Sequence, residues 1–183
     1  MKGTRLKTSV LPRSFYTYSP EIVARALLGK ILVHHREGER LSGRIVETEA
    51  YLGLSDPASH AFTGRSSRND VLFGPPGYAY IYLIYGMYSC MNVSCLPDGE
   101  AGGVLFRALD PIEGIDTMAR LRGLPATASA TQLTGGPGRL CQALGITRAT
   151  HNGLDVTDPK AILQIVDDGH RPEAIDVSPR IGI

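Results

Sequence analysis

The chain contains no tryptophan, only three cysteines and no long hydrophobic run, and the last two shortages each argue against a class of protein. Cys90, Cys95 and Cys141 are odd in number and lack Cys-x-x-Cys spacing, which argues against a disulfide scaffold and for reduced cytosolic thiols. No apolar stretch is long enough to cross a membrane, and no hydrophobic region follows the positive charges at the N-terminus. We therefore expect no membrane span and no secretion, but a location in the cytoplasm or nucleoid, or in the nucleus of a eukaryote.

Motifs for metal binding and nucleotide hydrolysis are also missing. His34 and His35 are adjacent, so a strand would point them in opposite directions, and the other histidines are scattered singly. The glycine-rich stretch 135–138 lacks the Gly-Lys-Ser/Thr ending of a phosphate-binding loop. The sequence therefore predicts no metal site.

A large excess of charge of one sign is absent, because the net charge is only +1. The charge is nevertheless uneven, with a positive excess in residues 1–40 and a negative excess in residues 150–183. A solvated basic face and a phosphate-facing arm explain the positive block equally well. Composition does not decide between them.

The proportions of apolar residues (43%) and charged residues (20%) are those of an ordinary globular protein. A chain of 183 residues suits one compact domain, and no internal repeat or linker divides it. We therefore predict a single domain over residues 1–183, expected to be a monomer. Residues 1–13 are basic and lack periodicity, so we predict a loose arm there.

Hydrophobic periodicity and capping residues predict the order of helices and strands. The clearest helix has Ser19 as its N-cap and Pro20 at its first position, and Gly29 ends it. Its predicted apolar face consists of Ile22, Val23, Ala26 and Leu27. The other predicted elements are strands over 31–35, 103–109 and 161–167 and helices over 111–122 and through 140–144.

Two carboxylates and a phenol are predicted to share one face of a strand. Polar and apolar residues alternate over residues 46–51, so Glu47, Glu49 and Tyr51 point one way and Val46 the other. Charged groups are buried only when they are paired or functional. This strand is therefore a candidate for chemistry.

A tyrosine-rich segment follows about thirty residues later. Tyr78, Tyr80 and Tyr82 share one face of a predicted strand, residues 85–88 interrupt the alternation as a hairpin tip would, and residues 91–95 form the return strand. Such a stripe most often serves packing. Tyrosine can also stack on a flat ring and still offer its hydroxyl, so a binding role stays open.

Two further segments carry polar candidates. Residues 53–77 form a long loop rich in Ser, Asp, Gly and Pro, and loops of this length in compact domains often carry function. The loop contains His60, Arg65 and Arg68, although a lone loop histidine is by itself a weak candidate. Arg107 interrupts an otherwise apolar strand, and a buried arginine is expected to face a carboxylate, a phosphate or water.

Several of these segments together resemble the alkyladenine (3-methyladenine) DNA glycosylases, and the resemblance covers nearly the whole chain after the basic arm. The matching blocks are long and occur in the same order as in that family. They are Val46-Glu47-Thr48-Glu49-Ala50-Tyr51-Leu52-Gly53, the Asp56-to-His60 loop, Ser67-Arg68-Asn69, Tyr80 to Tyr88, Met91-Asn92-Val93, Leu105 to Pro111, Gly136 to Leu144, and Pro179 to Ile183.

The resemblance implies an α+β fold with one curved, mostly antiparallel sheet, a protruding β-hairpin and packed helices. It implies a monofunctional enzyme of base excision repair that flips alkylated purines out of duplex DNA. Its substrates would be 3-methyladenine and 7-methylguanine, with hypoxanthine or ethenoadenine as further candidates, and hydrolysis would leave an abasic site. No cofactor is implied. A lyase would need an amine nucleophile, and all four lysines lie outside the matching blocks.

The resemblance also implies roles in catalysis and base binding. Glu49 is similar to the general base that activates the attacking water, and Arg107 to the residue that helps to hold this water. Tyr51, His60 and Tyr82 are similar to the residues that sandwich the flipped base. Glu47 matches no such role and is interpreted as structural.

Other matching residues are expected to contact DNA. Tyr85 is similar to the wedge that fills the gap in the duplex, and Asn92 to the residue that crowds the exocyclic amino group of normal guanine. The candidates for contact with the DNA backbone are Arg65, Arg68, Met87 and Tyr88.

Two rival functions differ in what they require of the carboxylates. A non-catalytic duplex-DNA-binding module on the same fold would keep the tyrosines and arginines but would not need Glu49. A small-molecule glycosidase could use Glu47 and Glu49, whose Cα atoms would lie about 6.5–7 Å apart on one strand face. Both carboxylates would then lie on the same side of the sugar, which argues against the second rival.

Overall fold

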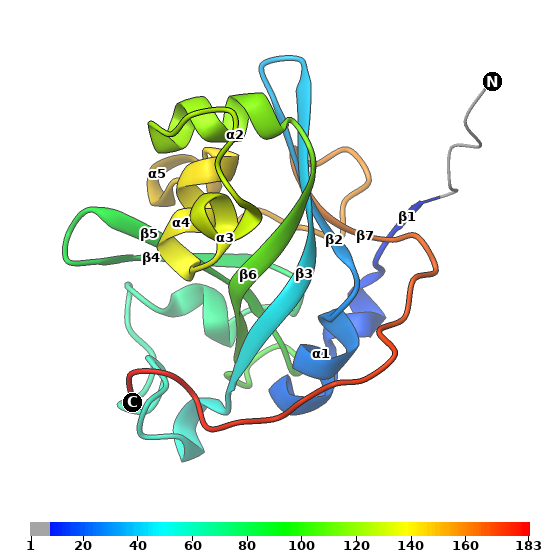
Figure 1. Cartoon of the computed structure of the whole chain (residues 1–183). Coiled ribbons are helices and arrows are strands. Elements are labelled where there is room, and N and C mark those ends of the chain that lie inside the picture. Colours follow the sequence, from blue (N-terminus) through cyan, green and yellow to red (C-terminus); the bar gives the residue numbers. More distant parts are fainter. Residues whose placement is uncertain (1–7) are drawn as a thin grey trace.

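The computed structural model describes residues 8–183, which fold around one curled, fully antiparallel sheet (Figure 1). The strand order is β1-β7-β2-β3-β6-β5-β4. The strands are β1 (Ser9–Val10), β2 (Ile31–Arg36), β3 (Glu39–Tyr51), β4 (Ala79–Ile84), β5 (Tyr88–Ser94), β6 (Gly103–Glu113) and β7 (Leu163–Asp167). The predicted α+β class, with a curved antiparallel sheet and a protruding hairpin, is confirmed.

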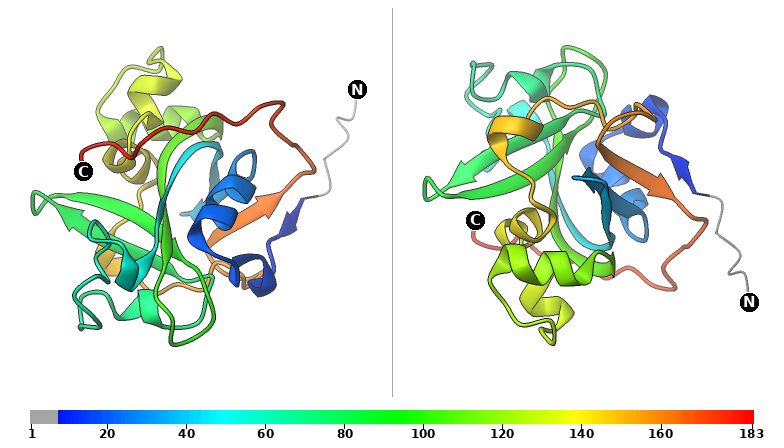
Figure 2. Two further views of the ribbon diagram at one scale, coloured as in Figure 1. Left: turned by 90° about the horizontal axis from the view of Figure 1, so that it is seen from below. Right: turned by 90° about the horizontal axis from the view of Figure 1, so that it is seen from above.

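The helices pack on two sides of the long central strands β3 and β6. They are α1 (Pro20–Leu27), α2 (Ile115–Arg122), α3 (Ala130–Thr134), α4 (Pro137–Leu144) and α5 (Arg148–His151). Helix α1 contacts β3 and β6 on one side. The other helices gather apart from α1: α3 contacts β6, α4 contacts β5 and β6, and α2 packs on α4 (Figure 2). The main core between these layers includes Leu27, Phe106 and Leu140, all fully buried.

The apolar face of α1 differs from the prediction. Val23 and Leu27 are buried as predicted, but Ala24 joins them, while Ile22 and Ala26 are exposed. At 3.6 residues per turn, Ala26 lies about 100° and Ile22 about 140° around the helix axis from Leu27, outside the face that Val23, Ala24 and Leu27 form.

The segment 111–122 is not one helix, and this prediction was wrong at its start. Strand β6 continues through Pro111 to Glu113, where it pairs with β3, and helix α2 begins only at Ile115. Pro111 has no N–H to donate, and the irregular register beside Gly43 accommodates it. Gly114 then adopts φ 75°, a left-handed conformation that ends the strand.

The predicted loose arm is also wrong where the structure describes it; residues 1–7 lie outside the described part. Ser9 and Val10 pair with β7, so this stretch closes one edge of the sheet. Arg13 donates to the Pro76 carbonyl (2.7 Å) and forms an ion pair with Asp155. These long-range partners hold a stretch that has no periodicity of its own.

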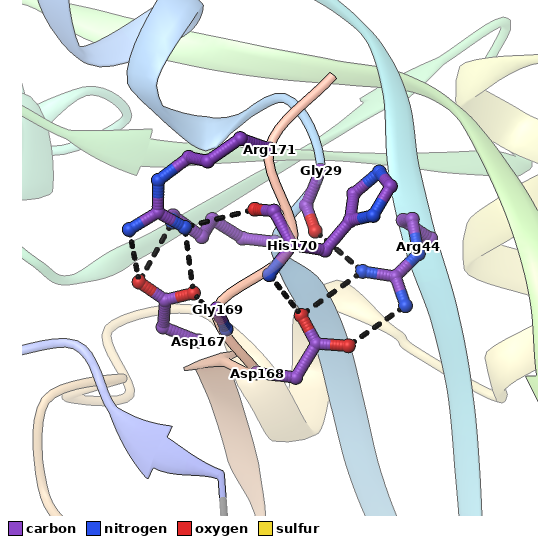
Figure 3. Close-up of polar contacts among 8 residues, drawn as sticks. Gly29, Arg44, Asp167, Asp168, Gly169, His170 and Arg171 are labelled. Carbon is purple, nitrogen blue, oxygen red and sulfur yellow. Dashed lines mark hydrogen bonds and ion pairs between the residues drawn. The ribbon is translucent and has the colours of Figure 1, made fainter. Parts of the chain in front are cut away.

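After β7 the chain continues as an extended C-terminal segment, residues 168–183, which crosses the molecule toward the loop after β3 (Figure 1). Two arginine–aspartate pairs anchor its start (Figure 3). Arg44 donates twice to Asp168 (2.8 and 3.1 Å) and also to the Gly29 carbonyl (2.7 Å), while Arg171 donates to both oxygens of Asp167. The hydrogen bonds from Arg44 lower the pKa of Asp168 to about 2, so this pair is ionised at neutral pH.

Candidate active site

Two register shifts between β3 and β6 lie beside Arg107, whose side chain faces the carboxylates of Glu47 and Glu49. The register shifts at Ile45/Glu47 and again at Glu47/Thr48, which leaves Val46 in β3 and Arg107 in β6 without an opposite partner. Bulges of this kind redirect side chains beside functional sites. The Arg107 Nε atom lies 3.1 Å from Glu47 Oε1, and its Nη1 atom lies 3.4 Å from Glu49 Oε1. The expectation that Arg107 faces a carboxylate is therefore confirmed.

Glu49 is almost completely buried and is surrounded by hydrogen-bond donors. Tyr51 Oη donates to Glu49 Oε2 at 2.9 Å, and the Ile181 backbone N–H donates to Oε1 at 2.8 Å. Burial, and then the hydrogen bond to Glu49, raise the pKa of Tyr51, so its hydroxyl keeps its proton and remains the donor. Glu47, in contrast, has a half-exposed side chain.

The predicted faces of β3 are therefore confirmed. Glu47 and Glu49 share Arg107, and Tyr51 reaches Glu49 on the same side. Thr48 points to the other side, where its hydroxyl donates to the Ala24 carbonyl of α1 (3.0 Å).

The four predicted base-binding residues line one small cavity. Its walls are Tyr51, Ala58, Ser59, His60, Leu72, Tyr80, Tyr82, Asn92 and Gly103. The ring centroids of His60 and Tyr82 lie 4.4 Å apart at an interplanar angle of 73°, an edge-to-face contact. Glu49 lines the neighbouring groove under the C-terminal segment, and Tyr51, which lines the cavity, connects the two through its hydrogen bond to Glu49.

His60 is held from two sides. Its Nδ1 atom lies 2.9 Å from the Tyr80 hydroxyl, and the Asn69 side chain donates to its backbone carbonyl at 2.8 Å. Burial, and then the positive charge of Arg68, lower the pKa of His60, so its ring is neutral at pH 7. Tyr80, which our sequence analysis did not assign to the site, was detectable as the neighbour of Tyr82 on the same strand face.

Asn92 lies on β5 and is buried in the wall of the same cavity. Its closest partner is the Tyr80 carbonyl, at 3.5 Å from its side-chain nitrogen. A bond this long is weak, so the amide is held mainly by packing.

The hairpin β4–β5 projects from the body of the molecule (Figure 1). Tyr85 lies at its tip with φ 52° and is 89% exposed, and Gly86 follows with φ 70°. Met87 and Tyr88 are exposed beside them. The predicted hairpin tip is confirmed, and it presents apolar side chains to solvent.

The two predicted loop arginines differ in their surroundings. Arg65 donates to Asp70 at 2.6 Å on the exposed surface, and so it is partly neutralised. Arg68 lines a cleft next to Tyr82, and Arg148 of α5, which our sequence analysis did not select, lines the same cleft. The positive charge beside the cavity therefore comes from two elements far apart in sequence.

Three residues that our sequence analysis left without a role also reach the site: Asp56, Arg180 and Ile181. Arg180 donates to both carboxylate oxygens of Asp56 (2.5 and 2.9 Å), and its Cζ atom lies 4.7 Å from the centre of the Tyr51 ring. The available signal was that all three residues fall within or beside the blocks that carry the family resemblance.

Within residues 8–183, no group of three or more His, Cys, Asp and Glu side chains is arranged to hold a metal ion, and no helix is long and apolar enough to cross a membrane. A buried carboxylate beside an aromatic cavity can take a proton from water and can stabilise positive charge on a sugar carbon.

Comparison with known proteins shows which sequences this chain is similar to. The sequence pattern described as methylpurine-DNA glycosylase matches residues 14–183. A protein of Koribacter versatilis is 54% identical over 173 residues, which are 94% of this chain and 83% of that protein. A protein of Methanocella arvoryzae is 48% identical over 174 residues, which are 95% of this chain and 84% of that protein. Both carry the name "Putative 3-methyladenine DNA glycosylase".

Proposed function

The chain belongs to the methylpurine-DNA glycosylase family, and from this membership we propose that it releases alkylated purines from duplex DNA. The observation that carries the proposal is the hydrogen bond to the buried Glu49 carboxylate from Tyr51, which lines the cavity together with His60 and Tyr82. The substrates are 3-methyladenine and 7-methylguanine, and hypoxanthine and ethenoadenine are further candidates. The enzyme is monofunctional and leaves an abasic site.

The reaction needs one carboxylate and one water molecule. Glu49 takes a proton from water as the water oxygen forms a bond to C1′, and the C1′–N bond breaks with its electron pair passing to the base. An alkylated base that carries a positive charge thereby leaves neutral. The Glu49 carboxylate also stabilises the positive charge that develops on the sugar. Arg107, 3.4 Å from Glu49, holds the water in line.

Binding of the flipped base rests on the aromatic walls. Tyr51 stacks on one face of the base, and the edge-to-face pair of His60 and Tyr82 covers the other. Stacking and cation–π attraction favour an electron-poor, positively charged ring. Asn92 in the cavity wall crowds the exocyclic amino group of normal guanine.

Contacts with the duplex come from the hairpin tip and the loop arginines. Tyr85 fills the gap that the flipped nucleotide leaves, which offsets part of the cost of unstacking. Arg65, Arg68, Met87 and Tyr88 contact the backbone, so duplex DNA is the partner.

Hydrolysis by water, without a lysine nucleophile, agrees with the positions of the two lysines that the structure describes. The Lys30 side chain is buried and donates to Asp167 at 2.8 Å, and Lys160 is exposed. Neither is among the residues that line the cavity. A Schiff base with the sugar would require an amine there.

The proposal is tested by incubating the protein with a labelled duplex that contains 7-methylguanine or 3-methyladenine, in the presence of a chelator. We expect free base in solution and strand breaks that appear only after alkali treatment. Tight duplex binding without any base release would instead support the non-catalytic binding module. Strand breaks without alkali would contradict the monofunctional reaction.

A further inference from the structure

The end of the C-terminal segment is fastened to the loop after β3 by one guanidinium group. Arg180 Nη1 donates to Asp56 Oδ2 (2.5 Å), and Nη2 donates to Asp56 Oδ1 (2.9 Å). Nη1 also donates to the Ala50 carbonyl of β3 at 3.1 Å. Asp56 itself accepts from the backbone N–H groups of Leu52 and Ala58, so the pair ties the segment to both sides of the turn.

The same guanidinium supports Tyr51 from behind. The Arg180 Cζ atom lies 4.7 Å from the centre of the Tyr51 ring, within the range of a cation–π contact. Tyr51 lines the base cavity but Arg180 does not; Arg180 lines the neighbouring groove under the C-terminal segment. The ring therefore separates the guanidinium from the space proposed for the base.

The residue after Arg180 contacts Glu49. Fixing Arg180 fixes the position of Ile181, whose backbone N–H donates to Glu49 Oε1 at 2.8 Å. The Arg180 side chain therefore holds both the Tyr51 ring, which lines the base cavity, and the Ile181 N–H, which donates to Glu49. A lysine could supply the charge but not the planar, two-pronged geometry.

We propose that Arg180 is a positioning residue of this active site, acting through Tyr51 and through the Ile181 N–H on Glu49. This inference rests on the proposed glycosylase function and deepens it, because it assigns a role in the reaction to the C-terminal segment. The hydrogen bonds from Arg180 hold the pKa of Asp56 at about 2, so the Arg180–Asp56 ion pair is intact throughout the neutral pH range.

The test compares Arg180→Gln with a matched control in the same segment. Arg171→Gln also removes a two-pronged pair with an aspartate, but Arg171 is exposed and its partner Asp167 lies at the end of β7, away from the cavity. We expect Arg180→Gln to lower the single-turnover rate of 7-methylguanine release by about 10- to 100-fold, the effect of a small misplacement of reacting groups. Duplex affinity should change little, and Arg171→Gln should keep the wild-type rate. Arg180→Gln leaves the buried Asp56 carboxylate without its cation and should lower the melting temperature, so the rates are compared well below the melting temperature of both variants.

Two more variants keep the test decisive. Arg180→Lys should also release base slowly, because an ammonium group cannot make the two-pronged contact of the guanidinium. Asp56→Asn should reproduce the loss of rate, and the double variant Asp56→Asn/Arg180→Gln should lose little more. Wild-type release rates in Arg180→Gln, or an equal loss in Arg171→Gln, would overturn the inference.

A second readout separates this inference from the proposed function. Hydrogen exchange of the Ile181 amide should be slow in the wild-type protein and in Arg171→Gln, and faster in Arg180→Gln. This measurement does not depend on base release, so it decides whether Arg180 positions the amide even if the wild-type protein proves inactive. Unchanged exchange in Arg180→Gln would contradict the positioning role.

Discussion

Glu47 and Glu49 are the same residue type two positions apart, yet their surroundings are very different. Glu49 is 6% exposed and accepts from a phenol and a backbone amide, whereas the Glu47 side chain is 48% exposed and contacts Arg107. Arg107 binds both, so Glu47 helps to hold the guanidinium that faces Glu49. The difference follows from Tyr51 and Ile181, which reach only Glu49.

A second pair of residues, His34 and His151, lies in the interior with the two imidazole rings in contact. Their Nε2 atoms lie 3.0 Å apart in the interior, His34 Nδ1 faces the Leu144 carbonyl (2.6 Å), and the Thr147 N–H donates to His151 Nδ1 (3.1 Å). These partners are satisfied when both rings are neutral, with His34 carrying its proton on Nδ1 and His151 on Nε2. A second proton on the His34 ring, at Nε2, would place two N–H groups opposite each other between the rings.

We predict that this pair makes the folded protein less stable below neutral pH. Burial lowers the pKa of His34 and of His151 below the ordinary value of about 6.5, so the unfolded chain binds more protons. Their contribution is complete above pH 6.5 and is lost as the pH falls below that value. Melting temperatures measured between pH 8 and pH 5 should decrease toward acid. In His34→Gln/His151→Gln this decrease should be smaller, and an unchanged decrease would contradict the account.

At the scale of elements, regular strands were predictable and short or irregular elements were not. The run of apolar residues at the start of 31–36 and the tyrosines at every second position in 79–84 are local patterns, so the sequence shows them directly. Strand β1, by contrast, has two residues and depends entirely on β7, and α5 has only four residues. These short elements are stabilised by tertiary contacts, so the local sequence contains no pattern that predicts them.

The hairpin β4–β5 exposes its tip to solvent. Tyr85 is 89% exposed at the tip, so replacing it with alanine should change the free energy of unfolding by no more than about 0.5 kcal/mol. Loss of the wedge should nevertheless slow base release from duplex DNA, because flipping loses its support. Tyr18→Ala, at an exposed tyrosine on another part of the chain, is the control and should release base at the wild-type rate. Equal rates for Tyr85→Ala and Tyr18→Ala would contradict the wedge role.

The same limits apply to the candidate site. The resemblance selected Glu49, Tyr51, His60 and Tyr82, and the structure brings them together. The redirection of Arg107 depends on register shifts between β3 and β6, which a single sequence does not reveal. The role of Arg180 depends on the path of an extended segment without periodicity, so its partner Asp56, 124 positions away, could not be inferred.

For the whole molecule, the fold gathers distant parts of the chain around one carboxylate. Strand β3 supplies Glu49, β6 supplies Arg107, and the C-terminal segment supplies the Ile181 amide. The loop after β3 and the hairpin β4–β5 supply the cavity walls. In the curled sheet β5 pairs with β6 and β4 forms the edge beside β5, and the hairpin that joins β4 and β5 projects from the body of the molecule (Figure 1).

The most direct test of the central claim compares Glu49→Gln with Glu47→Gln in single-turnover release of 7-methylguanine from duplex DNA. The two variants remove the same charge from positions two residues apart. We predict that Glu49→Gln loses about 10²- to 10⁴-fold in rate, as expected for removal of a general base, while it still binds the duplex. Glu47→Gln should keep most of the activity. A Glu49→Gln variant that releases base at the wild-type rate, or a larger loss in Glu47→Gln, would contradict the account.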